Sequence, residues 1–328
     1  MSNDNAAIYY ESGQTAYPLE LATTTDNVIY SASFAPFSAR AGFEAKVMPV
    51  GLENGAKITP AAGNNAIAVG NAAVVMPHVS GADASGRVTI TGDTLTLTRA
   101  TSSNTHIVHS IIVTSAGDFD SLAGTQGTAF GARGAAGGAP LIPVDAIEVG
   151  QVHLVGTVAA PVVANDIKQV AGLHQELSDF PIYTIDETFG EVHFADALPL
   201  IHVGNTAKRV YVEGYAPLFA EQPTTRDWVP AERSHTVSSE TFYGAVLGST
   251  SSSLSQASFT ARLKDGQTDN IVGVVNDKVW IKFKQDKNRL PYQLTQGVLG
   301  LARTYPADGA VNGAFTVSAE RATVNFNS

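Results

Sequence analysis

Two alternating runs lie back to back in the stretch Arg87-Val-Thr-Ile-Thr-Gly-Asp-Thr-Leu-Thr-Leu-Thr98. Alternation of apolar and polar residues is the pattern of β-strands that bury one face and leave the other in solvent. The Gly92-Asp93 pair between the two runs predicts a tight turn, so we expect these residues to form a β-hairpin. β-structure is therefore the first expectation for the whole chain.

Strand patterns recur along the rest of the sequence. In Val279-Trp-Ile-Lys-Phe-Lys284 we expect a half-buried strand, with Trp280 and the lysines on one face and with Ile281 and Phe283 facing the core. Further strands are predicted at residues 28–34, 107–113, 191–194, 209–213, 258–263 and 315–324.

Helical patterns are few and short. Thr268-Asp269 is a candidate cap for a helix in which Ile271, Val274 and Val275 form an apolar stripe, and a second helix is predicted at residues 172–180. Both are too short to be stable alone, so each must pack on a sheet. The predicted fold class is all-β with minor α-structure.

The composition favours self-assembly over nucleic-acid binding. Of 328 residues, 44% are hydrophobic and only 15% are charged, and the net charge is −10. A surface poor in charge can be buried against copies of itself without stranding many ions. The negative charge argues against general affinity for nucleic acid, which requires a basic surface. The chain has no cysteine, so disulfides and thiolate metal sites are excluded.

Targeting signals are not recognisable. The first residues contain neither a basic stretch nor an apolar run, and no segment approaches the roughly 18 apolar residues of a membrane span. We expect a soluble protein that is made in a cytoplasm.

Three segments rich in small or turn-forming residues are predicted to be loops, at residues 124–138, 221–234 and 248–255. Loops longer than about a dozen residues are often functional or interfacial. A weak internal repeat aligns residues 111–133 with residues 281–303, with six identities in 23 positions. If it is a true duplication, the chain holds two tandem β-domains, which we place at residues 1–150 and 151–328.

The eight histidines are the first candidates for a metal ligand or a general base. His106 and His109 lie three apart in a predicted strand, so they point to opposite faces and cannot share a metal. His174 and Glu176 have the spacing of part of a zinc-deaminase signature, but its cysteines are absent. We interpret the others as ordinary hydrogen-bonded or exposed residues: His78, His153, His193, His202 and His235.

Other chemical motifs are incomplete. Asp118 and Asp120, followed by Gly124, lack the remaining oxygen ligands of a calcium loop and are interpreted as an exposed acidic turn. Residues 124–138 contain neither a dinucleotide-binding motif nor a phosphate-binding lysine. No nucleophile elbow or Ser/His/Asp set is recognisable. We therefore predict no catalytic, cofactor-binding or metal site, and a protein that is not an enzyme.

A resemblance to a known family emerges in the C-terminal half. It is carried by His235-Thr-Val-Ser-Ser, Gly248-Ser-Thr-Ser-Ser-Ser-Leu-Ser, Ala257-Ser-Phe-Thr-Ala-Arg-Leu-Lys-Asp-Gly-Gln-Thr-Asp, Val279-Trp-Ile-Lys-Phe-Lys, Tyr292-Gln-Leu-Thr-Gln-Gly-Val-Leu-Gly and Gly313-Ala-Phe-Thr-Val-Ser-Ala-Glu. In order and spacing these segments resemble the major tail tube proteins of siphophages, bacteriophages with a long non-contractile tail. The resemblance covers residues 235–326 and is cumulative, since no single motif is diagnostic.

The resemblance implies a tail-tube-type β-sandwich or half-barrel with a short flanking helix, whose copies join their inner sheets into a ring. Rings would stack into a hollow tube of the virion that conducts the DNA genome, with tape-measure, tail-tip and terminator proteins as further partners. In the family, loops and a terminal arm bridge stacked rings, and we assign that role to residues 1–27, 124–138 and 221–234. The family's acidic lumen agrees in sign with the net charge of −10. Six chains would form a ring, or three if each chain holds two tube domains.

Other functions stay open. The chain could be another virion β-protein, such as a capsid decoration or baseplate subunit, or a carbohydrate-binding domain of a tail fibre. The last requires an exposed aromatic platform, whereas the aromatic residues, at 8%, are spread along the chain.

Overall fold

The computed structural model describes every residue except 1–4, 24–26, 33–35, 41, 49, 78, 80–81, 83–85, 102, 170–175, 177–181, 199–202, 204–208, 244 and 328. Strands dominate the described residues, which contain no helix of seven or more residues, so the all-β prediction is confirmed. In these residues no helix is long and apolar enough to cross a membrane. The chain forms two compact units, each built from more than one segment of the sequence.

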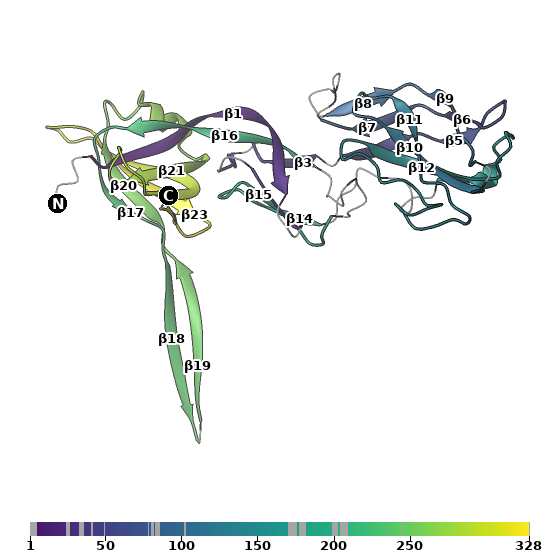
Figure 1. The fold of residues 1–328 in the computed structure, drawn as a ribbon. Helices are drawn as coiled ribbons and strands as arrows, with labels where there is room; N and C mark the ends of the chain where they lie inside the picture. Colours follow the sequence, from purple (N-terminus) through teal and green to yellow (C-terminus); the bar gives the residue numbers. More distant parts are fainter. Residues whose placement is uncertain are drawn as a thin grey trace. The chain divides into compact units, whose positions relative to one another are not determined.

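Unit 1 comprises Met1–Tyr17, Pro36–Ala45 and Gly214–Ser328 (Figure 1). Its main sheet has the antiparallel order β1-β21-β22-β23-β20-β17, with β16 beside β1 and β24 beside the start of β22. The strands are β1 (Ala7–Thr23), β16 (Val210–Gln222), β17 (Thr225–Val229), β18 (Arg233–Phe242), β19 (Ala245–Leu254), β20 (Ala257–Arg262), β21 (Lys278–Lys284), β22 (Tyr292–Thr304), β23 (Asn312–Ala319) and β24 (Val324–Phe326), with the 3₁₀ helix η3 at Asn270–Val274. One face of the sheet carries an apolar core in which Phe259 and Phe315 stack at 4.8 Å.

Unit 2 comprises Pro18–Ala35 and Lys46–Glu213. Three sheets, β11-β10-β12-β13, β4-β7-β8 and β5-β6-β9, enclose one continuous apolar core, and a fourth set of strands has the order β14-β15-β2. The strands are β2 (Ile29–Ser31), β3 (Lys46–Met48), β4 (Gly51–Gly55), β5 (Ile58–Pro60), β6 (Ala66–Val69), β7 (Ala72–Val75), β8 (Arg87–Ile90), β9 (Asp93–Thr96), β10 (His106–Val113), β11 (Phe119–Ala123), β12 (Ile147–Val155), β13 (Ile167–Lys168), β14 (Tyr183–Asp186) and β15 (Glu191–Phe194), with the 3₁₀ helix η1 at Ala164–Asp166.

The two alternating runs at residues 87–98 form strands, but the predicted hairpin between them is wrong. β8 pairs with β7 in one sheet, whereas β9 pairs with β6 in another. Gly92 therefore lies where the chain passes from one sheet to the next. Its amide donates a hydrogen bond to Asn71 Oδ1 at 2.7 Å, and a Cβ at this position would lie 2.6 Å from the carbonyl oxygen of Val69. Glycine is required here by close backbone approach.

β21 confirms the predicted alternation of faces and corrects its burial. The core cluster contains Ile281, with Phe283 packed against it, as expected. Trp280, predicted to be half-buried with the lysines, is only 1% exposed. The segment at residues 36–45 covers it, and its indole N–H donates to the carbonyl oxygen of Phe37 at 2.7 Å. A strand of unit 1 is thus buried on both faces near its start.

Some of the other predicted elements are present in the structure, and others differ from the prediction. The strands at residues 107–113, 191–194 and 258–263 are present as β10, β15 and β20, and the helix at 268–275 is the 3₁₀ helix η3, in which Ile271 and Val274 are buried. Residues 28–34 yield β2, 209–213 begin the longer β16, and 315–324 divide between β23 and β24. Two predicted loops contain strands instead, because residues 221–234 include β17 and 248–255 lie largely in β19. The helix at 172–180 lies outside the described residues except for Glu176.

The chain divides differently from the predicted domains 1–150 and 151–328. A boundary at residue 150 would cut β12, and the first 17 residues belong with the C-terminal unit because β1 pairs with β21. The suggested repeat also diverges in structure. Thr125-Gln126-Gly127 follow β11 in a loop, whereas the matching Thr295-Gln296-Gly297 lie inside β22. The two compact units therefore do not follow one another as a tandem pair divided near residue 150.

Candidate functional site

The most exposed element of the described structure is a two-stranded ribbon formed by β18 and β19. Ten residue pairs join the strands in register, from Arg233 opposite Leu254 to Phe242 opposite Ala245 (Figure 1). No third described strand pairs with either, so both outer edges carry free backbone donors and acceptors. Most of its described side chains are exposed, and Leu254 at the root is partly buried.

Serine and threonine make up half of the residues of this ribbon. On one face Ser234 and Ser253 are hydrogen-bonded at 2.8 Å, and Ser238 and Ser249 at 2.7 Å. These cross-strand pairs hold the register without burying apolar area. Larger apolar side chains at these positions would leave an aggregation-prone patch exposed on a free subunit. The sequence prediction of a Ser-rich loop failed here because both faces meet solvent, and such a strand has no apolar period.

The root of the ribbon is firmly held in unit 1. The backbone N–H of Ser255 donates to the carbonyl oxygen of Glu232 at 2.9 Å, and the N–H of Glu232 donates to Ser255 Oγ at 2.9 Å. Ala231, fully buried, exchanges hydrogen bonds with Thr323 at 2.8 Å in each direction. The ribbon therefore projects from a base that is fixed by hydrogen bonds.

A buried carboxylate fixes the strap at residues 36–45 onto unit 1. Glu11 is fully buried and accepts hydrogen bonds from Ser38 Oγ at 2.5 Å and from the backbone N–H of Trp280 at 3.0 Å. Burial raises the pKa of Glu11, although these hydrogen bonds oppose the effect. Arg40 and Asp277 form an ion pair at 2.7 Å beside it. These contacts hold the strap against β21.

The Gly-rich residues 124–138, assigned from the sequence to ring bridging, pack within unit 2. The Arg133 guanidinium forms an ion pair with Glu148 on β12, which is 1% exposed and also accepts from Ser110 Oγ at 2.6 Å. A Cβ on Gly137 or Gly138 would lie within 2 Å of a backbone oxygen of the same loop. These glycines are dictated by close packing, so the loop is a structural part of unit 2.

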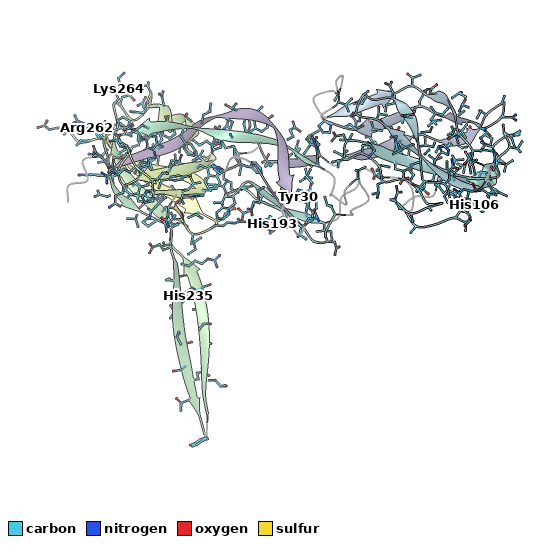
Figure 2. All side chains as sticks on the ribbon, in the orientation of Figure 1. Tyr30, His106, His193, His235, Arg262 and Lys264 are labelled. Atoms are coloured by element: carbon cyan, nitrogen blue, oxygen red, sulfur yellow. The ribbon has the colours of Figure 1, made fainter. Side chains whose placement is uncertain are left out.

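Of the described histidines, His106 and His153 share a contact with Phe130, and the others lie in different surroundings. His109 is buried, its Nε2 lies 2.8 Å from the carbonyl oxygen of Thr98, and burial lowers its pKa. His106 lies on the opposite face, as predicted, where Phe130 of the Gly-rich loop packs between it and His153 with ring centroids 4.7 and 4.9 Å away. His193 contacts Glu191, and His235 lies on the ribbon (Figure 2). His78, His174 and His202 lie outside the described residues.

The predicted acidic turn at Asp118 and Asp120 is confirmed as exposed. The Asp120 carboxylate accepts a hydrogen bond from the N–H of Ser121 at 2.7 Å, and Gly117 adopts a positive φ of 83° in the turn. Among the residues that the structure describes, no three His, Asp or Glu side chains group to hold a metal ion.

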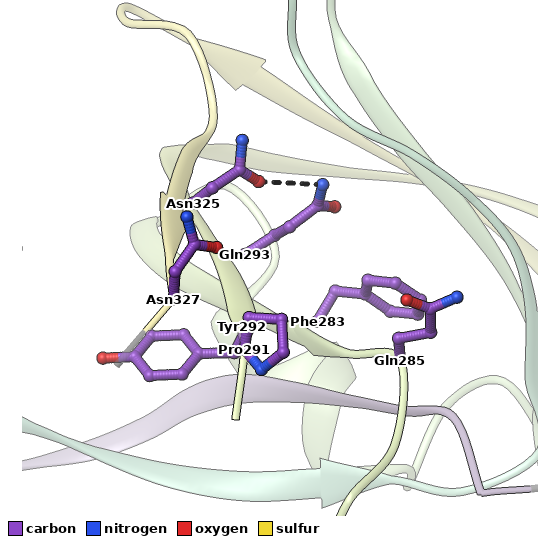
Figure 3. Close-up of a pocket in the computed structure, with 7 residues that line it drawn as sticks. All are labelled: Phe283, Gln285, Pro291, Tyr292, Gln293, Asn325 and Asn327. Atoms are coloured by element: carbon purple, nitrogen blue, oxygen red, sulfur yellow. Dashed lines mark hydrogen bonds between the residues drawn. The ribbon is translucent and has the colours of Figure 1, made fainter. Parts of the chain in front are cut away.

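A shallow hollow lies between the ends of β21, β22 and β24 (Figure 3). It holds about 110 Å³, and Gln293 on its wall links Trp228 Nε1 at 2.7 Å to Asn325 Oδ1 at 3.1 Å. Its small volume and the absence of a titratable carboxylate, histidine or lysine in its lining give it no catalytic constellation. Its lining residues are Phe283, Gln285, Pro291, Tyr292, Gln293, Asn325 and Asn327.

Comparison with known proteins adds no family. No protein-family model matches the chain, and no curated protein matches it.

Proposed function

We propose that this chain is a structural subunit of a bacteriophage tail tube. Copies would form rings, rings would stack into a tube of the virion, and the lumen would conduct the DNA genome without specific binding. The observation that carries the proposal is the ribbon of β18 and β19, a surface built to be covered by another molecule.

The physics of the ribbon supports assembly. Ten residues per strand correspond to roughly 30 Å, and an isolated two-stranded ribbon is at best marginally stable in water. A neighbouring copy that pairs with the free edges would satisfy the backbone groups that now face solvent. The low charge of the chain, 15% Asp, Glu, Lys and Arg, lowers the desolvation cost of such contacts.

The fold changes which segments we assign to the contacts between rings. Residues 124–138 pack inside unit 2, 221–234 include β17, and most of 1–27 forms the long strand β1. The ribbon takes their place in the proposal. It also lies within residues 235–326, the region that resembles siphophage tail tube proteins.

One tube-like unit per chain favours a ring of six. The three-chain ring required two similar domains in tandem, and the units of this chain interleave in sequence. Tape-measure, tail-tip and terminator proteins remain the further partners that the tube function requires, with the virion as its location.

Excision of the ribbon tests the proposal. Because Glu232 and Ser255 are hydrogen-bonded to each other, residues 233–254 can be replaced by Asn-Gly, which closes a two-residue turn. Negative-stain electron microscopy and sedimentation should give rings or tubes for the full chain, with a lumen wide enough for duplex DNA. The excised variant should remain a folded monomer. A full chain that stays monomeric at every concentration, or an excised variant that assembles equally well, would overturn the proposal.

A further inference from the structure

We propose that the ribbon tip of one copy docks, through Glu240 and Leu247, on the face of β21 and β22 that presents Lys284 and Tyr292 in a second copy. This inference rests on the proposed function and names the receiving surface for the ribbon. It gives the assembly a head-to-tail contact, in which two different patches of the same chain meet.

The receiving face carries lysines without an acidic partner. Among the described residues no carboxylate lies within 4 Å of the amino groups of Lys282, Lys284 or Lys287, and the Lys284 amino group contacts only the carbonyl oxygen of Lys287, at 3.5 Å. Lys282 and Lys284 lie on the same face because they are two residues apart in β21. In a chain of net charge −10, this is a local excess of positive charge.

Aromatic rings hold Lys282 in place. The Lys282 amino group lies 4.4 Å from the ring centroid of Phe219 and 4.6 Å from that of Tyr292. Tyr292 in turn stacks on Phe326 at 4.9 Å. Partial burial, and then repulsion from the charge of Lys284, lower the pKa of Lys282. An incoming carboxylate would relieve that repulsion and would find the site already ordered.

Glu221 does not pair with these lysines. Glu221 is close enough to Tyr9 to raise the pKa of that phenol, after the larger effect of burial. It forms no ion pair with the lysines of this face among the described contacts. Tyr292 also lines the hollow in Figure 3, together with Pro291.

The ribbon tip offers the complementary groups. Glu240 is the single carboxylate of β18 and β19, it is exposed, and no described cation pairs with it. Leu247 stands directly opposite Glu240 in the register and is 63% exposed. Val237 and Tyr243 add exposed apolar area nearby. A carboxylate beside an uncovered leucine on an otherwise Ser/Thr-rich ribbon marks a contact point.

The two patches match in spacing as well as in charge. Lys284 and Tyr292 are directly opposite each other in the register of β21 and β22, as Glu240 and Leu247 are in the ribbon. Directly opposed side chains have Cβ atoms about 4.5–5.5 Å apart, so Glu240 can meet Lys284 while Leu247 meets the ring of Tyr292. The ribbon extends away from the body of unit 1, so its tip is presented to a second copy (Figure 1).

Reciprocal charge reversal tests the contact. Glu240→Lys and Lys284→Glu should each raise the concentration needed for assembly about tenfold or more, and the double variant should recover most of that loss. Asp308→Lys, an exposed change of the same charge in unit 1, is the matched control and should leave assembly unchanged. Thermal melting of each variant checks that folding is intact.

Disulfide trapping gives a second readout, because the chain has no cysteine of its own. A mixture of the Glu240→Cys and Lys284→Cys variants should give a cross-linked dimer on oxidation, and a mixture of Asp308→Cys with Lys284→Cys should not. If the full chain assembles while the single reversals have no effect, or only the control pair cross-links, the inference is overturned and the tail tube proposal stands. If the full chain never assembles, both are overturned.

Discussion

Replacing Arg133 with methionine would leave the carboxylate of Glu148 buried without its cation. Removing one partner of a buried ion pair costs about 3–5 kcal/mol, and the 21% exposure of the Arg133 side chain places the expected loss near the lower limit. The lost hydrogen bond from Arg133 Nη1 to the carbonyl oxygen of Pro140, 2.7 Å long, adds about 1 kcal/mol. We therefore expect unit 2 to lose about 4 kcal/mol of unfolding free energy, a large part of the ~5–15 kcal/mol typical of a domain.

Urea unfolding can measure this loss with an internal reference. Trp228 and Trp280 are the two tryptophans of the chain and both belong to unit 1, so their fluorescence follows that unit, whereas far-ultraviolet circular dichroism follows both units. A loss of 4 kcal/mol corresponds to a shift of the unit 2 midpoint by about 2 M urea. The tryptophan transition should move much less.

The double variant Arg133→Met with Glu148→Gln provides the control. Glutamine keeps an oxygen for Ser110 and removes the uncompensated charge, so most of the loss should disappear. A midpoint for Arg133→Met within about 0.5 M urea of the parent protein would refute the argument that this ion pair holds the Gly-rich loop.

Three further predictions concern single buried positions. Gly138→Ala should abolish soluble folded protein, because the new Cβ would lie 1.8 Å from the carbonyl oxygen of Ala132, whereas Gly273→Ala, with open space around it, should express normally. Burial raises the pKa of Glu11 in the folded protein above its ordinary 4.5, so the free energy of unfolding should fall as pH rises from 4.5 through that folded pKa. Over this range Glu11→Gln should be more stable than the parent in urea unfolding followed by tryptophan fluorescence. A lower stability of the variant would contradict the assignment. Burial lowers the pKa of His109 in the folded protein below 6.5, so the free energy of unfolding of unit 2 should fall as pH drops from 6.5 towards that folded pKa. His109→Gln should lose less stability than the parent between pH 7 and pH 5, as measured by urea unfolding followed by circular dichroism.

Local alternation was enough to predict the fold class and several strands. β21 shows why. One of its faces packs against the core through Ile281 and Phe283, and the other carries Lys282 between them in the sequence, so the two faces differ in polarity. The same pattern could not reveal that residues 36–45 cover Trp280, because such a contact joins positions more than 200 residues apart. Alternation therefore shows which face of a strand is apolar, but it does not show which segment packs against that face.

Pairing was the part that sequence could not supply. β8 and β9 alternate well on both sides of Gly92, yet each pairs with a strand that precedes both. A turn signal and a sheet-to-sheet crossing use the same residue type, because both bring backbone segments close together. The ribbon was missed for the opposite reason, since Ser249 and its neighbours have solvent on both faces and show no apolar period.

The pairing of β1 with β21 has a consequence for biosynthesis. Tyr10 leaves the ribosome early, but its partner Ile281 follows 271 residues later, an interval of roughly 14–54 s at bacterial elongation rates. Unit 2 lies wholly between Tyr10 and Ile281 in the sequence and can fold during that interval, whereas the sheet of unit 1 cannot close until translation is nearly complete. A polysome carrying many nascent chains would therefore hold none with a finished docking face. The order of the strands in the sequence is therefore enough to delay polymerisation until the chain is released from the ribosome.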